Sequence, residues 1–94
     1  MESEFVWDPI KALSNRFKHG VSFEEASTVF ADPLALTVLD PRFEGSREVR
    51  FVTIGTSELR RTIVVAHCEH GDQIRIISAR KPTRRERFAY EEGA

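Results

Sequence analysis

The hydrophobic period of this 94-residue chain changes at Leu34, and that change constrains the fold more than any other feature. Before Leu34, apolar residues recur at helical spacing. After it, short runs rich in β-branched residues follow one another, separated by turn residues. These runs cover residues 34–39, 49–55, 61–68 and 73–79. We therefore predict four consecutive strands that pair as an antiparallel meander.

A capping signal predicts the first helix. Asp8 precedes Pro9, so the aspartate can accept a free N–H group while the proline occupies the first helical position. The helix covers about residues 9–18, after a short strand that carries Phe5 and Trp7 on its apolar face. The residues that follow at helical spacing form its predicted apolar face: Ile10, Leu13 and Phe17.

Two capping boxes predict the other helices. Ser22 and Glu25 begin a helix at Phe23 that stops before Asp32-Pro33. Thr83 and Glu86 begin a final helix over about residues 84–92. Residues 40–48 form a polar connection that we expect to be mobile. The predicted fold class is α+β: a short N-terminal strand, two helices, a four-stranded antiparallel meander and a C-terminal helix, with the helices against one sheet face.

The last hairpin allows its two faces to be assigned. A two-residue turn at His70-Gly71 or at Gly71-Asp72 gives the same division. The predicted core face carries Ile63, Val65, His67, Ile74, Ile76 and Ser78. The other face carries Val64, Ala66, Cys68, Arg75, Ile77 and Ala79. On that second face Arg75 lies beside small side chains, which leave its guanidinium accessible.

Length and composition indicate one domain over residues 1–94. Hydrophobic residues are 40% and charged residues 31% of the chain, which argues against disorder and membrane spanning. The acidic N-terminus lacks the pattern of a signal peptide, so we expect a cytoplasmic protein. The single cysteine, Cys68, cannot form an internal disulfide.

Charge is distributed unevenly along the chain. Residues 1–48 carry nine acids and five bases, whereas residues 49–94 carry six acids and nine bases. The bases cluster near the end of the last strand and the start of the final helix: Arg75, Arg80, Lys81, Arg84, Arg85 and Arg87. Such a cluster can hold a phosphate by charge and guanidinium hydrogen bonds. The alternative is a solvated helix face paired with Glu91 and Glu92.

Several kinds of site are excluded. The chain has no glycine-rich phosphate loop, no nucleophile elbow and no paired-cysteine zinc spacing. His67 and Cys68 alternate to opposite faces of a strand, which is poor geometry for one metal ion. Cys68 lies in an apolar strand, where cysteine is usually a small buried hydrophobe. We predict no metal ion and no cofactor.

Five segments and one later tyrosine form a distinctive combination: FVWDPIK at 5–11, KHGVSFEEA at 18–26, RFVTIG at 50–55, IRIISARK at 74–81 and RRER at 84–87, followed by Tyr90. Together these segments resemble the BrnT family of bacterial toxins. The resemblance covers almost the whole chain, although Pro82 stands where an alanine is more usual. It implies a compact RelE-like ribonuclease, RNA cleavage that halts translation, and neutralisation by a BrnA antitoxin with a ribbon-helix-helix DNA-binding domain. It also implies that toxin and antitoxin together repress their own operon, so that operator DNA is reached only through the antitoxin.

Metal-free RNA cleavage uses the substrate's 2′-hydroxyl as nucleophile, so the protein must align the phosphodiester, neutralise growing charge and assist proton transfer. We expect Arg75 and Arg80 to clamp the scissile phosphate and Tyr90 to place its hydroxyl near the leaving group. His67 or His19 is the expected acid or base. Further RNA contacts are assigned to Lys18, His19, Arg50, Arg84 and Arg85.

Two other functions stay open from the residues. The chain could be a non-catalytic interaction module whose basic sheet edge binds an acidic or amphipathic partner. A stand-alone DNA-binding protein fits less well, because no segment resembles a recognition helix and the net charge is −1.

Overall fold

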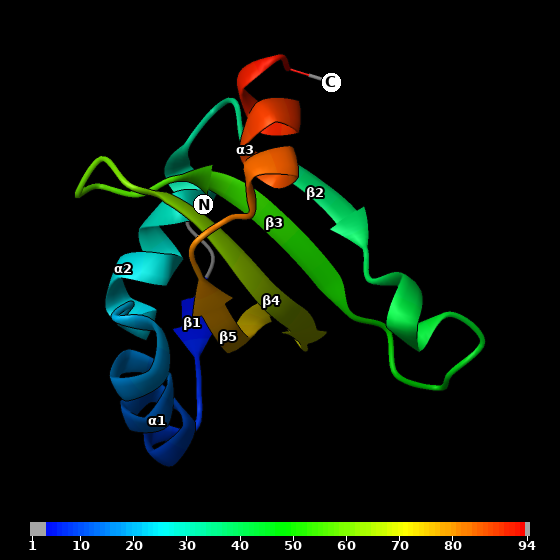
Figure 1. The fold of residues 1–94 in the computed structure, drawn as a ribbon. Coiled ribbons are helices and arrows are strands. Elements are labelled where there is room, and N and C mark those ends of the chain that lie inside the picture. Colours follow the sequence, from blue (N-terminus) through cyan, green and yellow to red (C-terminus); the bar gives the residue numbers. More distant parts are fainter. Residues whose placement is uncertain (1–3, 94) are drawn as a thin grey trace.

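A computed structural model describes residues 4–93 of the protein (Figure 1). Its strands are β1 (Glu4–Val6), β2 (Leu36–Leu39), β3 (Phe51–Thr56), β4 (Thr62–His70) and β5 (Gln73–Arg80). Its α-helices are α1 (Pro9–His19), α2 (Phe23–Thr28) and α3 (Arg84–Glu91), and two 3-10 turns are η1 (Val29–Ala31) and η2 (Pro41–Phe43). The predicted α+β fold and its order of elements are confirmed. The expectation that all helices lie against one sheet face is wrong, because α3 binds residues of the face opposite α1 and α2.

The five strands form one sheet in the order β1-β5-β4-β3-β2. The meander from β2 to β5 is antiparallel, as predicted. The first strand adds a feature that the sequence did not reveal: β1 pairs in parallel with β5, with Val6 opposite Arg75. The chain between β1 and β5 runs through α1, α2 and the strands β2 to β4, which supplies the long crossover that a parallel pair needs. The sheet is therefore mixed.

The core lies between the sheet and the pair α1–α2. Its fully buried members are Val21, Phe23, Ala26, Val29, Ile63, Val65, Ile76 and Ala79. Both predicted N-caps act at their helix starts, but only Thr83 and Glu86 form a complete capping box, because the Glu25 carboxylate accepts from Ser57 and Arg61 instead. The Ser22 hydroxyl accepts a hydrogen bond from the Glu25 N–H at 3.0 Å, and Thr83 and Glu86 cap each other. These caps fix where α2 and α3 begin.

The predicted inner face of α1 is wrong. Ile10, Leu13 and Phe17 are 78%, 73% and 93% exposed, so this apolar stripe faces solvent. The helix instead turns Asn15 inward. The Asn15 amide donates to the carbonyl oxygens of Val21 and Ala79 and accepts from the Ala79 N–H. Three hydrogen bonds to buried backbone groups thus set the rotation of the helix against its apolar pattern.

A β-bulge changes the predicted faces of β5. The hairpin turn is Gly71-Asp72, one of the two expected positions, because His70 pairs with Gln73. The register then slips by one residue: Ala66 pairs with Ser78 and His67 with Ile76, which leaves Ile77 unpaired. Ala79 consequently lies in the core, 0% exposed, and Ser78 lies on the opposite face. For these two residues simple alternation predicted the wrong side.

Candidate active site

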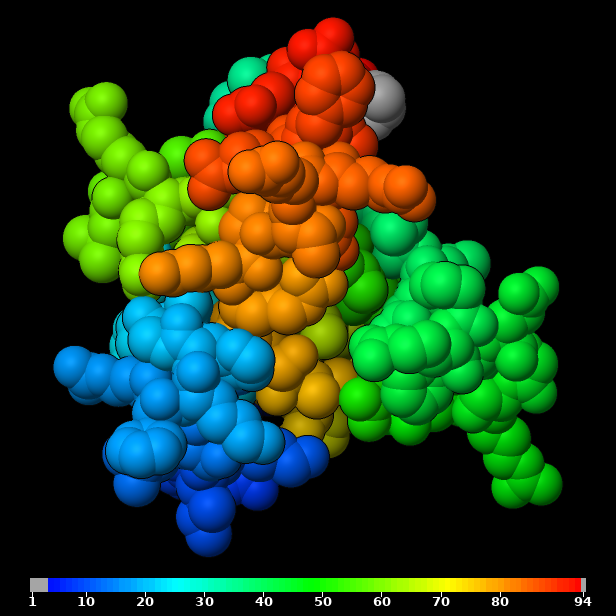
Figure 2. Space-filling view, in the orientation of Figure 1, coloured from blue at the N-terminus to red at the C-terminus, as the bar shows by residue number. Residues whose placement is uncertain are grey.

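The sheet face turned away from α1 and α2, here called the open face, collects the cationic side chains. Since Val65 and His67 face the core, their neighbours Val64, Ala66 and Cys68 lie on the open face. Figure 2 shows a hollow in the middle of the molecule, bordered by α1, the β2–β3 connection and the start of α3. The floor is the β-sheet itself, with small and apolar residues on β4 and two arginines on β5.

The bulge brings Arg75 and Arg80 to this same face. Arg75 pairs with Cys68 and Arg80 with Val64, and these two β4 residues share the open face. Without the extra residue Ile77, alternation along β5 would send the two arginines to opposite faces. Their backbone positions are four β4 residues apart, or about 13 Å at the usual strand rise. The two side chains therefore extend from separate points of the same surface.

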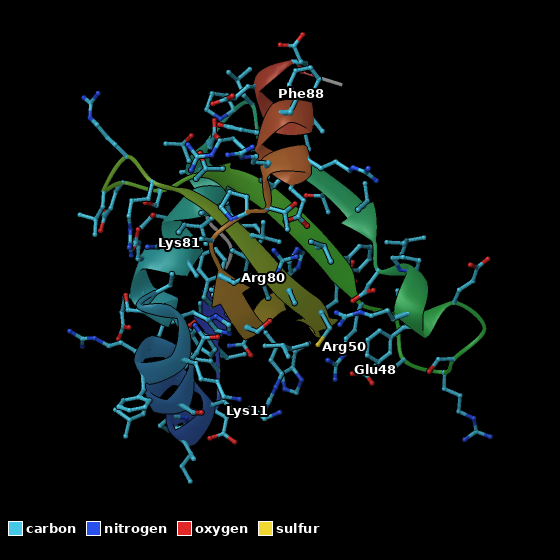
Figure 3. All side chains as sticks on the ribbon, viewed as in Figure 1. Lys11, Glu48, Arg50, Arg80, Lys81 and Phe88 are labelled. Carbon is cyan, nitrogen blue, oxygen red and sulfur yellow. The ribbon has the colours of Figure 1, made fainter. Side chains whose placement is uncertain are left out.

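Arg80 is fixed by the first turn of α3. Its Nη1 and Nη2 donate to the two carboxylate oxygens of Glu86 at 2.8 and 2.9 Å. The same carboxylate accepts from the Thr83 N–H at 2.8 Å. The Arg80 hydrogen bonds outweigh partial burial and lower the pKa of Glu86 to about 2. Glu86 is therefore an anion at neutral pH. Figure 3 shows its partner Arg80 near the centre of the view, below α3.

Arg75 is half-buried on β5, between the edge strand β1 and β4. Among residues 4–93 it makes no ion pair or side-chain hydrogen bond. Its guanidinium is thus available to an anion from outside the chain.

Tyr90 holds the other end of α3. Its hydroxyl lies 2.7 Å from the Thr56 hydroxyl and donates to the Asp32 carboxylate at 2.5 Å. Thr56 lies on the open face, because it is two residues after Ile54, which pairs with the open-face residue Val64. Burial and the bond to Asp32 raise the pKa of Tyr90, so the phenol keeps its proton at neutral pH. Because Glu86 and Tyr90 are four residues apart on one helix face, α3 is held at β5 and at β3.

Arg42, which the sequence analysis did not select, approaches the site from η2. Its guanidinium pairs with Asp40 at 2.7 Å, and its charge lies close enough to Arg80 to oppose the rise in the Arg80 pKa. The segment 40–48 looked like a mobile polar loop, although Asp40-Pro41 repeats the Asp-Pro cap that begins α1. The Asp40 side chain does accept from the Arg42 N–H, so the cap was the available signal.

Arg50, a predicted RNA contact, lies beside the same connection. It donates to Glu48 at 2.6 Å, and its guanidinium carbon is 4.4 Å from the centre of the Phe43 ring. An open depression of about 440 Å³ runs along this connection from Leu39 to Arg50. Figure 3 shows Arg50 and Glu48 together at this border of the hollow.

His67, the predicted acid or base, lies on the core face. It is 6% exposed, and its Nε2 is 2.7 Å from the Thr53 hydroxyl. Its ring packs between Phe30 and Phe51, with centroid distances of 4.8 and 5.7 Å. Burial lowers the pKa of His67 to about 4, so the imidazole is neutral at pH 7. The sheet separates it from Arg75, Arg80 and Tyr90.

A comparison with known families decides what this fold is. The family model described as "Ribonuclease toxin, BrnT, of type II toxin-antitoxin system" matches residues 7–86. The chain belongs to the BrnT family. It is thus a ribonuclease toxin of a type II toxin-antitoxin system, and a cognate antitoxin is implied. No curated protein matches the chain.

The fold of the toxin matches a solved structure of the same family. It is similar to the ribonuclease toxin BrnT of Brucella abortus, known from a 1.1 Å crystal structure, with a TM-score of 0.67 and 21% identity. The match covers 88% of this toxin and 100% of that chain. At this identity the likeness bears on the fold, including the mixed sheet and the C-terminal helix.

The remaining predicted RNA contacts of this BrnT toxin lie in two places. Arg84 and Arg85 are exposed in the first turn of α3, next to the Arg80–Glu86 pair. Lys18 and His19 are exposed at the end of α1, and among residues 4–93 no hydrogen bond or ion pair joins them to Arg75 or Arg80. No helix within residues 4–93 has the length and hydropathy to cross a membrane.

Proposed function

We propose that this toxin cleaves RNA on the open face without a metal ion, using the substrate's own 2′-hydroxyl as nucleophile. The observation that carries the proposal is the bulge at Ile77, which gives Arg75 and Arg80 a common surface beside Tyr90. An RNA strand lying across β5 can place successive backbone groups against these side chains. Arg84 and Arg85 extend the same cationic surface along α3.

Arg80 acts on the scissile phosphate in this proposal. Its planar guanidinium already makes a paired contact with the Glu86 carboxylate, and a phosphate presents the same arrangement of two oxygens. The RNA phosphate therefore competes with Glu86 for Arg80. Charge that develops on the phosphorane is stabilised by the guanidinium, and Arg75 holds a neighbouring part of the backbone.

Tyr90 is the proton donor to the leaving group. Its raised pKa keeps the hydroxyl protonated, and Asp32 and Thr56 orient it. We assign His67 a packing role because it is neutral, buried and on the other face of the sheet. His19 stays the alternative acid or base, since it is exposed at the end of α1.

The partner proposed for this toxin is a BrnA-like antitoxin with a ribbon-helix-helix DNA-binding domain. In this scheme the antitoxin neutralises RNA cleavage, and with it the block of translation, in the cytoplasm. The pair represses its own operon through the antitoxin's DNA contacts. Membership of the BrnT family supports a partner of this type.

The chemistry is tested with a short RNA and a matched RNA that carries one 2′-deoxy nucleotide at the cleavage site. Purified toxin is expected to cleave the first at the same rate with and without EDTA, to yield a 2′,3′-cyclic phosphate end, and to leave the second intact. Loss of cleavage in EDTA, or cleavage of the deoxy substrate at the unchanged position, refutes the metal-free mechanism.

A further inference from the structure

Helix α1 presents an apolar stripe that no part of residues 4–93 covers. Ile10, Leu13 and Phe17 have the spacing of one helix face, and at 73–93% exposure they are among the most exposed large apolar residues of the described chain. Figures 1 and 2 show α1 at one corner of the molecule, away from β2, β3 and α3. Contiguous exposed apolar residues of this kind mark interaction surfaces.

The exposure is fixed by the way the helix is held. Asn15 lies on the inner side of α1 and makes its three hydrogen bonds to backbone groups of Val21 and Ala79. A rotation that buried Phe17 would break those bonds and leave buried polar groups without partners. The stripe therefore faces outward in the stable form of the toxin.

The charged residues around the stripe indicate which kind of partner it binds. Lys11 and Lys18 flank it on one side and Arg16 flanks it on the other, and all three are exposed. The segment Pro9–His19 contains no acidic residue. A depression of about 240 Å³ between α1 and α2 is bordered by Leu13 and Arg16 on the α1 side and by Glu24 on the α2 side. An apolar ridge edged by cations fits an amphipathic helix whose apolar face is edged by acids.

We propose that the stripe Ile10, Leu13 and Phe17 is a docking surface for an acidic amphipathic helix of the cognate antitoxin. This rests on the antitoxin partnership proposed above. A second copy of the toxin fits less well, because two α1 helices packed together would bring cations against cations. The stripe lies on the side of α1 opposite Asn15 and so faces away from β5, where docking anchors the antitoxin and leaves RNA contacts to another antitoxin segment.

The experiment measures binding of the purified antitoxin, encoded beside the toxin gene, to full-length toxin variants by calorimetry. The double variant Leu13→Asp/Phe17→Asp is expected to bind at least about 30-fold more weakly than wild type, the size of an interface hot spot. Arg16→Glu is expected to weaken binding and reduce its salt dependence. The matched control is Leu59→Asp, an apolar residue that is 63% exposed in the β3–β4 turn.

RNA cleavage by the same variants separates this proposal from the ribonuclease mechanism. All three variants are expected to fold and to cleave RNA at the wild-type rate, while the stripe variant escapes inhibition by the antitoxin. Wild-type affinity of the stripe variant, no antitoxin binding by the wild type, or equal weakening by Leu59→Asp overturns the docking surface. If the stripe variant loses RNA cleavage but keeps its antitoxin affinity, the stripe binds RNA. If the wild-type toxin is a dimer and the stripe variant is a monomer, the stripe mediates self-association. Either result overturns the antitoxin docking surface.

Discussion

Replacing Asn15 by alanine removes the contact that orients α1 and caps the end of β5. The Ala79 N–H donates to Asn15 Oδ1 at 3.1 Å, and the Ala79 and Val21 carbonyl oxygens accept from Nδ2 at 2.8 and 3.0 Å. The β1 pairing ends at Arg75, so no strand replaces these bonds. Each buried backbone group left without a partner costs about 1–3 kcal/mol, so we expect Asn15→Ala to lower the free energy of unfolding by about 3–4 kcal/mol.

For a domain of this size, that loss corresponds to a fall in Tm of about 15–20 °C. Urea and thermal unfolding followed by circular dichroism measure it, with Ser14→Ala, an exposed neighbour on α1, as the matched control. The control is expected to stay within about 0.5 kcal/mol of wild type. If Asn15→Ala is no less stable than Ser14→Ala, then hydrogen bonding by Asn15 does not set the rotation of α1.

Three further predictions concern His67, Tyr90 and Gly55. Burial lowers the pKa of His67 to about 4, so below pH 6.5 the unfolded chain binds a proton that the folded chain does not. The free energy of unfolding should therefore fall by up to about 3 kcal/mol between pH 6.5 and pH 4. Urea midpoints measured across this range should show the fall, and His67→Gln should remove it. Tyr90→Phe should lower kcat for RNA cleavage by about 100-fold while costing only about 1–2 kcal/mol of stability, and an unchanged kcat would exclude a catalytic hydroxyl. Gly55→Ala should destabilise the fold by about 1–3 kcal/mol, since the added Cβ would lie 2.8 Å from the Val29 side chain and 3.0 Å from the Ala35 side chain. Thermal unfolding measures this loss, and an unchanged Tm would show that Val29 and Ala35 move aside without cost.

The order of elements could be predicted because local signals fix it. The Asp8-Pro9 and Ser22 caps begin the first two helices, and the change of hydrophobic period marks the strands. The rotation of α1 could not be predicted from its pattern, because three hydrogen bonds of one asparagine outweigh an apolar stripe. A polar residue in mid-helix opposite that stripe was the only local sign.

The sequence predicted which residues make up the candidate site better than it predicted how they are arranged. Arg75, Arg80 and Tyr90 were selected as cations and a hydroxyl near the chain's end, and they lie on one face or at its border. Their shared face depends on the bulge at Ile77, which follows from long-range pairing and has no signature in the alternation of β5. Arg42 was missed because its position depends on how the β2–β3 connection folds back.

The most direct test of the proposed site compares kcat/KM for RNA cleavage by Arg80→Ala, Arg75→Ala and Arg60→Asn in EDTA. Arg60 is an exposed arginine in the β3–β4 turn with a φ of 62°, so asparagine removes a charge there and tolerates the backbone. We predict a loss of about 100-fold or more for Arg80→Ala and about tenfold for Arg75→Ala, with Arg60→Asn close to wild type. Equal, small losses for all three would show that these arginines contribute only general charge, and would contradict a catalytic site on the open face.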